Sequence, residues 1–180
     1  MLKKILEVYL QKGIGKIDFH YDTHGKPFLP GHPNLQFNCS HTSHAFAIGI
    51  TQKYNIGIDI EHKDRLVDIS KLKKFLFSAN ELEQFENIPD VYRQQAFIHC
   101  WTKKEALLKA TGSGLTRPMN EFSLSGSEKE TMGFDTVYPG LKNPKWFVKN
   151  FHLPGAIVGA LATNGHVKSV NYINVSEFNW

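Results

Sequence analysis

The sequence has few cysteines and no long hydrophobic run. Cys39 and Cys100 are its two cysteines and are not spaced as C-x-x-C, so we expect both to be reduced and structural. No apolar stretch approaches the roughly 18 residues of a membrane span. Met1 opens an amphipathic stretch and not a basic segment followed by an apolar core. We therefore expect a cytoplasmic protein that does not act at a membrane.

Low-complexity tracts are also absent, which excludes a largely disordered chain. A length of 180 residues, 41% of them hydrophobic and 12% aromatic, suits one compact unit with a sizeable core. The formal net charge of +4 favours an anionic partner. On charge alone, nucleic acid, a phosphorylated small molecule and an acidic protein are all candidates.

Hydrophobic periodicity predicts a mixture of helices and strands. Apolar residues between positions 2 and 9 recur at helical spacing, with Gly13 as a stop. Residues 16–22 and 35–40 are predicted strands around a loop rich in glycine and proline. The apolar segments 45–51 and 55–61 are predicted to form a hairpin.

Capping signals mark two further helices. Ser78 with Glu81 three residues later forms a capping box that opens a short helix. Asp90 is the expected cap of a long helix that Gly112 and Gly114 end. Short strands are expected downstream, at residues 121–125, 133–138, 145–151, 156–163 and 167–175.

The last two of these strands resemble the segments 45–51 and 55–61, as if a strand pair occurred twice. Chance similarity between apolar strands is the simpler explanation. A duplicated α+β half would also produce the echo.

The segment 55–61 carries two acids on one strand face. Side chains two apart project from the same side, so Asp59 and Glu61 point together while Ile58 and Ile60 point the other way. Neighbouring carboxylates repel each other, and a hard divalent ion such as Mg²⁺ relieves that repulsion. A half-exposed strand with two solvated acids is the alternative.

The long helix presents a second group of polar side chains. Trp101, Glu105 and Lys109 are spaced i, i+4, i+8 and share one stripe. An acid and a base beside an aromatic ring can bind a metal and the anion that it neutralises. An ordinary surface Glu-Lys pair has the same spacing.

Two loop segments contain candidate anion ligands. Ser40 and His41, within "NCSHTSH", can donate to phosphate oxygens. Adjacent residues rarely aim at each other and no G-x-S-x-G elbow is present, so anion binding is favoured over serine hydrolysis. Lys26 lies between Gly25 and Pro27 in a stiffened turn that can present its ammonium to a ligand or to solvent.

The segments "GKPFLP", "FNCSHTS", "GIDIE" and "WTKKEALLKATGSGL", in this order and spacing, resemble the successive signatures of the Sfp-type 4′-phosphopantetheinyl transferases. The resemblance covers most of the chain. It implies an α+β fold of two similar halves related by a pseudo-twofold axis, with coenzyme A bound between them. We place the halves at residues 1–62 and 63–180.

The resemblance also implies roles for individual residues. Mg²⁺ on the coenzyme A pyrophosphate would be coordinated by Asp59, Glu61 and Glu105. The phosphates would be contacted by Ser40, His41 and Lys109, and Lys26 would lie near the nucleotide.

The implied reaction is attack by a serine hydroxyl of an acyl or peptidyl carrier protein on the β-phosphate, releasing 3′,5′-ADP. Mg²⁺ and Lys109 would stabilise the developing charge, and Glu105 is the expected base. Carrier proteins of this kind are typically acidic, so a basic surface would orient them. Apolar residues between positions 66 and 85 are candidate docking contacts.

The chain departs from the family pattern at its beginning. Typical members have a further stretch before the first helix, which contributes a strand and basic residues that hold the 3′-phosphate, so we expect this half to be shortened. Three explanations are open: the true start lies upstream, Lys3, Lys4 and their neighbours replace those contacts, or binding is weakened to the point of inactivity. A degenerate domain that binds carrier protein or coenzyme A without turnover is therefore an alternative. A Mg²⁺-dependent nuclease, suggested by "EHK" at 61–63, is less favoured because Asp59 is too close in sequence. We accordingly expect no nucleic acid partner.

Overall fold

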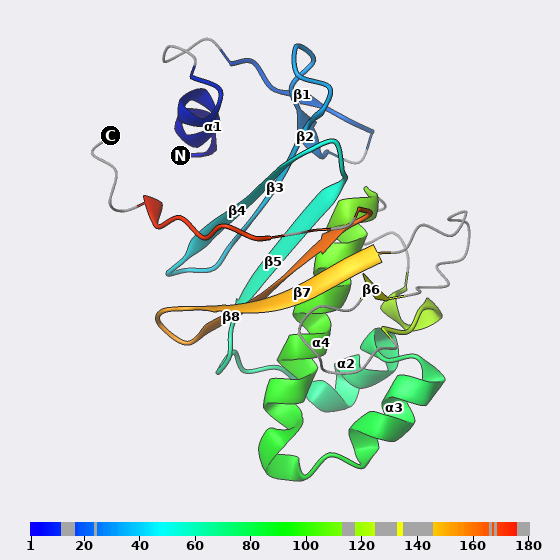
Figure 1. The fold of residues 1–180 in the computed structure, drawn as a ribbon. Helices are drawn as coiled ribbons and strands as arrows, with labels where there is room; N and C mark the ends of the chain where they lie inside the picture. The colour runs from blue at the N-terminus through cyan, green and yellow to red at the C-terminus, as the bar shows by residue number, and fades with distance from the viewer. Residues whose placement is uncertain are drawn as a thin grey trace.

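The protein combines helices and strands in one α+β arrangement (Figure 1). The computed structural model describes residues 1–11, 17–23, 25–112, 118–124, 133–134, 146–165, 167 and 169–175. Its helices are α1 (Leu2–Tyr9), α2 (Ile69–Leu76), α3 (Ala79–Glu86), α4 (Asp90–Thr111) and the 3₁₀ turn η2 (Met119–Glu121). Its strands are β1 (His20–Tyr21), β2 (Pro27–Phe28), β3 (Leu35–His41), β4 (Phe46–Gln52), β5 (Ile56–His62), β6 (Gly133–Phe134), β7 (Trp146–Leu153) and β8 (Ile157–Thr163).

The strand pairing corrects one prediction. The segments 45–51 and 55–61 do not form a hairpin: β4 pairs antiparallel with β3, whereas β5 pairs antiparallel with β8 in a sheet of order β5-β8-β7-β6. The pairing of β5 with a distant strand has a physical reason. Residues 56–60 of β5 are all buried, so this strand needs cover on both faces, and a two-stranded hairpin with β4 would leave it exposed.

Side chains of β3 join the two sheets. Ile58 and Ile60 have backbone N–H groups that donate to the Asn38 side-chain oxygen at 2.9 Å and to the Ser40 hydroxyl at 3.2 Å. Buried N–H groups need partners, and here side chains supply them at the edge of β5. The spacing of these contacts shows that β3 and β5 run in the same direction.

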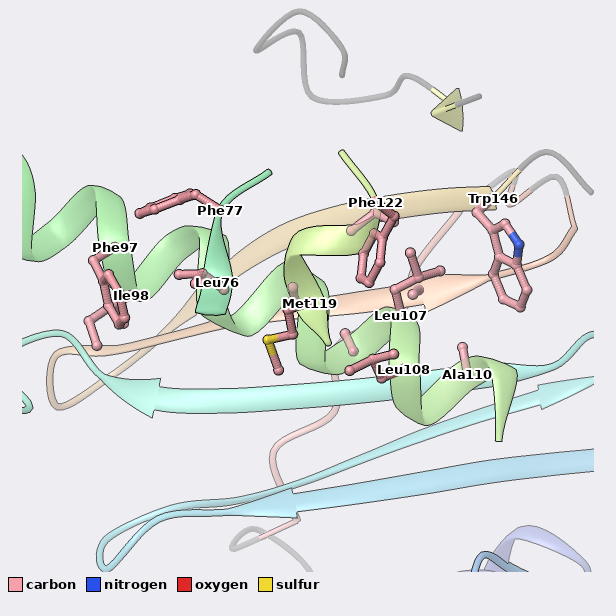
Figure 2. Close-up of a cluster of buried hydrophobic side chains, with 14 of the residues drawn as sticks. Leu76, Phe77, Phe97, Ile98, Leu107, Leu108, Ala110, Met119, Phe122 and Trp146 are labelled. Carbon is pink, nitrogen blue, oxygen red and sulfur yellow. The ribbon is translucent and has the colours of Figure 1, made fainter. Parts of the chain in front are cut away.

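Helix α4 covers one face of the four-stranded sheet (Figure 1). A Cβ atom on Gly57 would overlap the Ala106 carbonyl oxygen and the Ala110 nitrogen, so glycine permits the close approach of α4 to β5. The main hydrophobic cluster lies along α4, where Leu107 and Leu108 are buried. Figure 2 shows these two residues with side chains from α2, η2 and β7, including Leu76, Met119, Phe122 and Trp146.

The opposite face of the sheet has a separate apolar cover. Ile58 and Ile60 belong to a second cluster, against which Val167 and Val170 of the C-terminal segment pack. A third cluster joins α1 to β3, with Leu6 buried. Helix α1 thus packs against β3, and α4 covers the four-stranded sheet, while β1 and β2 form a separate two-stranded sheet. The division at residue 62 stays a prediction.

The helix boundaries confirm most of the capping signals. The capping box of Ser78 and Glu81 opens α3, and Gly112, with φ of 73°, ends α4. Asp90 is not the cap that we expected. Pro89 occupies the N-cap position, and Asp90 forms an ion pair at 2.7 Å with Arg93 in the first turn.

Two of the expected downstream strands are wrong. Glu121 belongs to η2, and residues 122–124 form no strand. Residues 169–174 are also without regular structure, because this segment packs across the sheet through its apolar side chains. The strand expected at 16–22 is present only as the two-residue strand β1. Of the strand expected at 133–138, the described part is the two-residue strand β6. Gly13 and Gly114 lie outside the described residues.

The described part of the chain contains no helix that is long and apolar enough to cross a membrane.

Candidate active site

Strand β5 directs two carboxylates toward α4. Gly57 faces α4, and residues two and four positions later project from the same side of a strand. Asp59 and Glu61 therefore face the helix, as the spacing predicts, while Ile58 and Ile60 pack into the cluster on the other side. Asp59 is 5% exposed, so the simple alternative of two solvated acids is wrong for this residue.

Asp59 is the centre of a hydrogen-bond network that joins β3, β5 and α4. Its Oδ1 accepts hydrogen bonds from the Ser40 hydroxyl at 3.0 Å and from Lys109 Nζ at 2.7 Å. Lys109 Nζ also donates to Ser40 Oγ at 3.3 Å. The second oxygen, Oδ2, is buried and has no hydrogen-bond partner among the described residues. A buried carboxylate oxygen without a donor is the kind of atom that a cation satisfies.

Glu105 completes a group of three acids at this position. Burial, followed by the negative charges of Asp59 and Glu61, raises the pKa of Glu105 to about 7. Burial also raises the pKa of Asp59 and the pKa of Glu61. Carboxylates influence each other in this way when they lie close together in a site of limited solvent access. The three acids predicted from the sequence therefore lie close together, although Asp59 and Glu61 belong to β5 and Glu105 belongs to α4.

The donor set suits a hard divalent cation such as Mg²⁺, which prefers oxygen ligands. Three carboxylates and the unpartnered Asp59 Oδ2 are available at the cluster. As the side chains stand, the described residues contain no group of three or more His, Cys, Asp or Glu side chains placed to hold a metal ion. Two cations explain this arrangement, because Lys109 pairs with Asp59 and Arg65 pairs with Glu61.

Arg65 is a site residue that the sequence analysis missed. Its guanidinium forms an ion pair with Glu61 and lies 5.8 Å from the ring centroid of Trp101. The signal was available in the sequence, because Arg65 follows Glu61 by four residues just as Trp101 precedes Glu105 by four. The spacing between Glu61 and Arg65 could not be interpreted from the sequence alone, because the sequence does not show that the loop after β5 turns back toward α4.

Lys26 connects the end of α4 to the start of β5. Its Nζ donates to the Ile56 carbonyl at 3.2 Å and to the Lys109 carbonyl at 3.3 Å. The last carbonyls of a helix lack partners within the helix, so this contact caps α4. Burial lowers the pKa of Lys26. The Lys26 ammonium thus binds backbone oxygens in this structure, and its expected place near the nucleotide stays a prediction.

A pocket of about 340 Å³ lies beside Lys26. Its walls come from the loop that contains β2 and from the C-terminal turn of α4, and they include Asp22, Phe28, Pro33, Asn55, Thr111 and Gly112. The size is typical of a small-molecule site. The carboxylate cluster is outside this pocket, and Lys109 connects the two, because its carbonyl binds Lys26 while its ammonium binds Asp59.

Comparison with known proteins decides the family. Residues 55–161 match the model of the 4′-phosphopantetheinyl transferase superfamily. The chain belongs to this superfamily. Among curated relatives it is 31% identical to the 4′-phosphopantetheinyl transferase HetI of Nostoc sp., over 92% of this chain and 68% of that protein. It is 30% identical to the 4′-phosphopantetheinyl transferase Sfp of Bacillus subtilis, over 69% of this chain and 54% of that protein.

The chain spans about two thirds of the first relative and about half of Sfp and of ffp from the same species. Among solved structures, the holo-[acyl-carrier-protein] synthase of Thermotoga maritima matches with a TM-score of 0.45 and 20% identity, over 61% of each chain. The predicted family and the predicted α+β fold are confirmed. The enzyme class, a 4′-phosphopantetheinyl transferase, is confirmed at the level of the family.

The family motif around Ser40 has an unexpected structural role. The Ser40 hydroxyl donates to Asp59 and accepts from Ile60 and Lys109, so its hydrogen and both lone pairs are used within the protein. His41 is exposed at the end of β3. The phosphate contacts expected of Ser40 and His41 stay predictions.

The lysine of the family segment "WTKKE" that precedes Glu105 is a second residue that sequence reasoning missed. Lys104 is fully buried. Its Nζ donates to Glu81 at 2.6 Å and to three backbone carbonyls, those of Leu76, Met119 and Phe122, at 2.7–2.9 Å. Lys104 therefore ties α2, α3 and η2 to the helix that carries Glu105 and Lys109. The sequence around Lys104 does not predict its burial, because Lys104 lies between two charged residues and charged residues are usually exposed.

Proposed function

We propose that the protein transfers the 4′-phosphopantetheine group of coenzyme A to a serine of an acyl or peptidyl carrier protein in a Mg²⁺-dependent reaction. One observation carries this proposal: Asp59, Glu61 and Glu105 come together beside Lys109, and the buried Asp59 Oδ2 lacks a partner. HetI and Sfp are both named 4′-phosphopantetheinyl transferases, which supports transfer of this group.

The carboxylate cluster would hold the metal, with Asp59, Glu61 and Glu105 as ligands. When bound, Mg²⁺ would neutralise charge on the diphosphate and make the β-phosphorus a better electrophile. The network around Ser40 fixes the position of Asp59 before any ligand arrives, which reduces the cost of ordering it on binding.

Lys109 and Glu105 would act on the reacting groups. A serine oxygen of the carrier protein attacks the β-phosphorus, and the bond from this phosphorus to the bridging oxygen breaks and releases 3′,5′-ADP. Lys109 stabilises the negative charge that develops on the phosphoryl oxygens. Glu105 would accept the serine proton, the role that an ionised carboxylate beside an attacking hydroxyl can play.

The pocket beside Lys26 would receive the nucleotide end of coenzyme A. It adjoins the turn of α4 that contains Lys109, so a molecule bound there can extend toward the carboxylates. Carrier docking is expected on the stretch 66–85, in which Leu66 is 95% exposed and Phe75 is 38% exposed. The net charge of +4 favours an acidic partner. A cytoplasmic location agrees with the two unpaired cysteines.

Intact mass of a carrier protein tests the proposal. Apo-carrier protein incubated with coenzyme A, Mg²⁺ and this protein should gain the mass of one phosphopantetheine. EDTA should prevent the gain, and Glu105→Gln should reduce its rate by at least about 100-fold. An unchanged mass with several carrier proteins, from folded protein that still binds coenzyme A, would instead identify a binding domain without turnover.

A further inference from the structure

We propose that Arg65 is an exchangeable counter-ion of the carboxylate cluster, which occupies Glu61 in the free protein and moves to the coenzyme A diphosphate when the metal binds. The inference rests on the proposed function in two respects, the binding of a divalent cation at Asp59, Glu61 and Glu105 and the binding of the coenzyme A diphosphate beside it. It adds a residue that couples the binding of the two ligands.

Arg65 is held at the cluster by three contacts. The guanidinium pairs with the Glu61 carboxylate and lies over the Trp101 ring of α4 at 5.8 Å. The Gln94 side-chain amide, also from α4, donates to the Arg65 carbonyl. The Gln94 contact fixes the backbone of Arg65 against the helix, whereas the guanidinium itself is held by Glu61 and Trp101.

Arg65 occupies a carboxylate that the metal would need. Its guanidinium pairs with Glu61, which projects from the same face of β5 as Asp59. The guanidinium therefore does for the free protein what a metal ion would do for the loaded protein. Both cations need the same carboxylate oxygens, and they compete.

Arg65, and not Lys109, is the cation that can leave. The Lys109 side chain is 29% exposed and its ammonium is held by both Asp59 and Ser40. The Arg65 side chain is 44% exposed, and Trp101 offers its guanidinium a second support through a cation–π contact. A guanidinium matches phosphate geometry through paired N–H donors, so the diphosphate is a suitable acceptor after release from Glu61.

Two measurable consequences follow from this competition. Removal of the positive charge at position 65 should strengthen metal binding by about fivefold or more, the size expected of a partly screened charge at a few ångströms. Coenzyme A should promote metal binding in the wild-type protein, because the diphosphate accepts Arg65. By linkage, the metal promotes coenzyme A binding by the same factor.

Isothermal titration calorimetry with Mg²⁺ or Mn²⁺, with and without coenzyme A, tests both consequences on the full chain. Arg65→Gln should bind the metal more tightly than wild type without coenzyme A, and coenzyme A should then promote metal binding less. Arg65→Lys keeps the charge and should stay within about twofold of wild type. Lys71→Gln removes one charge from an exposed ion pair with Asp68 and controls for net charge. Far-UV circular dichroism confirms that each variant folds.

The sign of the Arg65→Gln effect decides the outcome. Metal binding that is unchanged or weaker would mean that Arg65 only holds Glu61 in place, and the exchange would be wrong. If no variant and no wild-type protein binds a divalent cation, with or without coenzyme A, the proposed metal site fails as well. The two failures are therefore distinguishable.

Discussion

Glu105 has an environment that differs strongly from that of a free side chain. Its neighbours are acids and its site is buried, and its pKa rises from 4.5 to about 7. Between these two pH values, Glu105 is protonated in the folded protein and ionised in the unfolded chain. Its contribution to stability is therefore full below about pH 4.5 and is lost as the pH rises through about 7.

We predict that the metal-free protein, in EDTA, loses thermal stability between pH 5 and 8 relative to Glu105→Gln, which has no proton to lose. Thermal melts across this range measure the difference. Mg²⁺ should raise the melting temperature of wild type more at pH 8 than at pH 5.5, because metal binding requires ionised carboxylates. Parallel pH profiles for the two proteins would contradict the raised pKa. His99, whose pKa is lowered by burial, is present in both wild type and Glu105→Gln, so its contribution cancels in the difference between their pH profiles.

The spacing of residues was sufficient to select the three acids and Lys109 that the structure brings together. Asp59 and Glu61 share a strand face because the period of a strand is two, and Glu105 and Lys109 share a helix stripe because i and i+4 are neighbours. Arg65 and Lys104 could not be found in this way. Their roles depend on a loop and on buried carbonyls from distant segments, and no local period describes either.

At the scale of the element, α4 carries the site and is itself held by a buried charge. Lys104 Nζ binds Glu81 and three backbone carbonyls. Breaking a buried ion pair by removing one partner costs about 3–5 kcal/mol, because the other charge is left without compensation.

We therefore predict that Lys104→Met lowers the free energy of unfolding by about 3–5 kcal/mol, measured by urea denaturation. Lys103→Met, the adjacent lysine with a partly exposed side chain, should change it by less than about 1 kcal/mol. The double variant Lys104→Met/Glu81→Gln should recover part of the loss, since it removes the orphaned charge. A loss in Lys104→Met no larger than that in Lys103→Met would show that the buried ammonium is not essential.

Elements were easier to predict than their partners. The helices α1, α3 and α4 and the strands β3, β4, β5, β7 and β8 follow from local periodicity and capping. The pairing of β5 with β8 instead of β4 depends on residues about 100 positions away, which no local pattern contains. The C-terminal segment has the alternation of a strand, but it packs through Val167 and Val170.

At the scale of the whole molecule, the β3-β4 sheet and the four-stranded sheet meet at a junction between β3 and β5. At this junction, side chains take the place of a ladder of backbone hydrogen bonds. Asn38 and Ser40 lie two apart on β3 and satisfy successive free N–H groups of β5. The same Ser40 hydroxyl fixes Asp59, so the junction of the sheets and the carboxylate cluster are one structure. A change in this junction should therefore affect both stability and the site.

Asn38→Ala tests this coupling. It leaves the buried Ile58 N–H without an acceptor, and we expect a loss of about 1–3 kcal/mol in the free energy of unfolding. The Ile58 amide should exchange its hydrogen faster relative to amides of β8, because the opening is local to the junction. Gln36→Ala is the matched control on the same strand face, since the Gln36 side chain donates to Pro33 within its own loop. Equal stability in the two variants, with unchanged exchange at Ile58, would mean that packing of β3 against β5 holds the sheets together without this hydrogen bond.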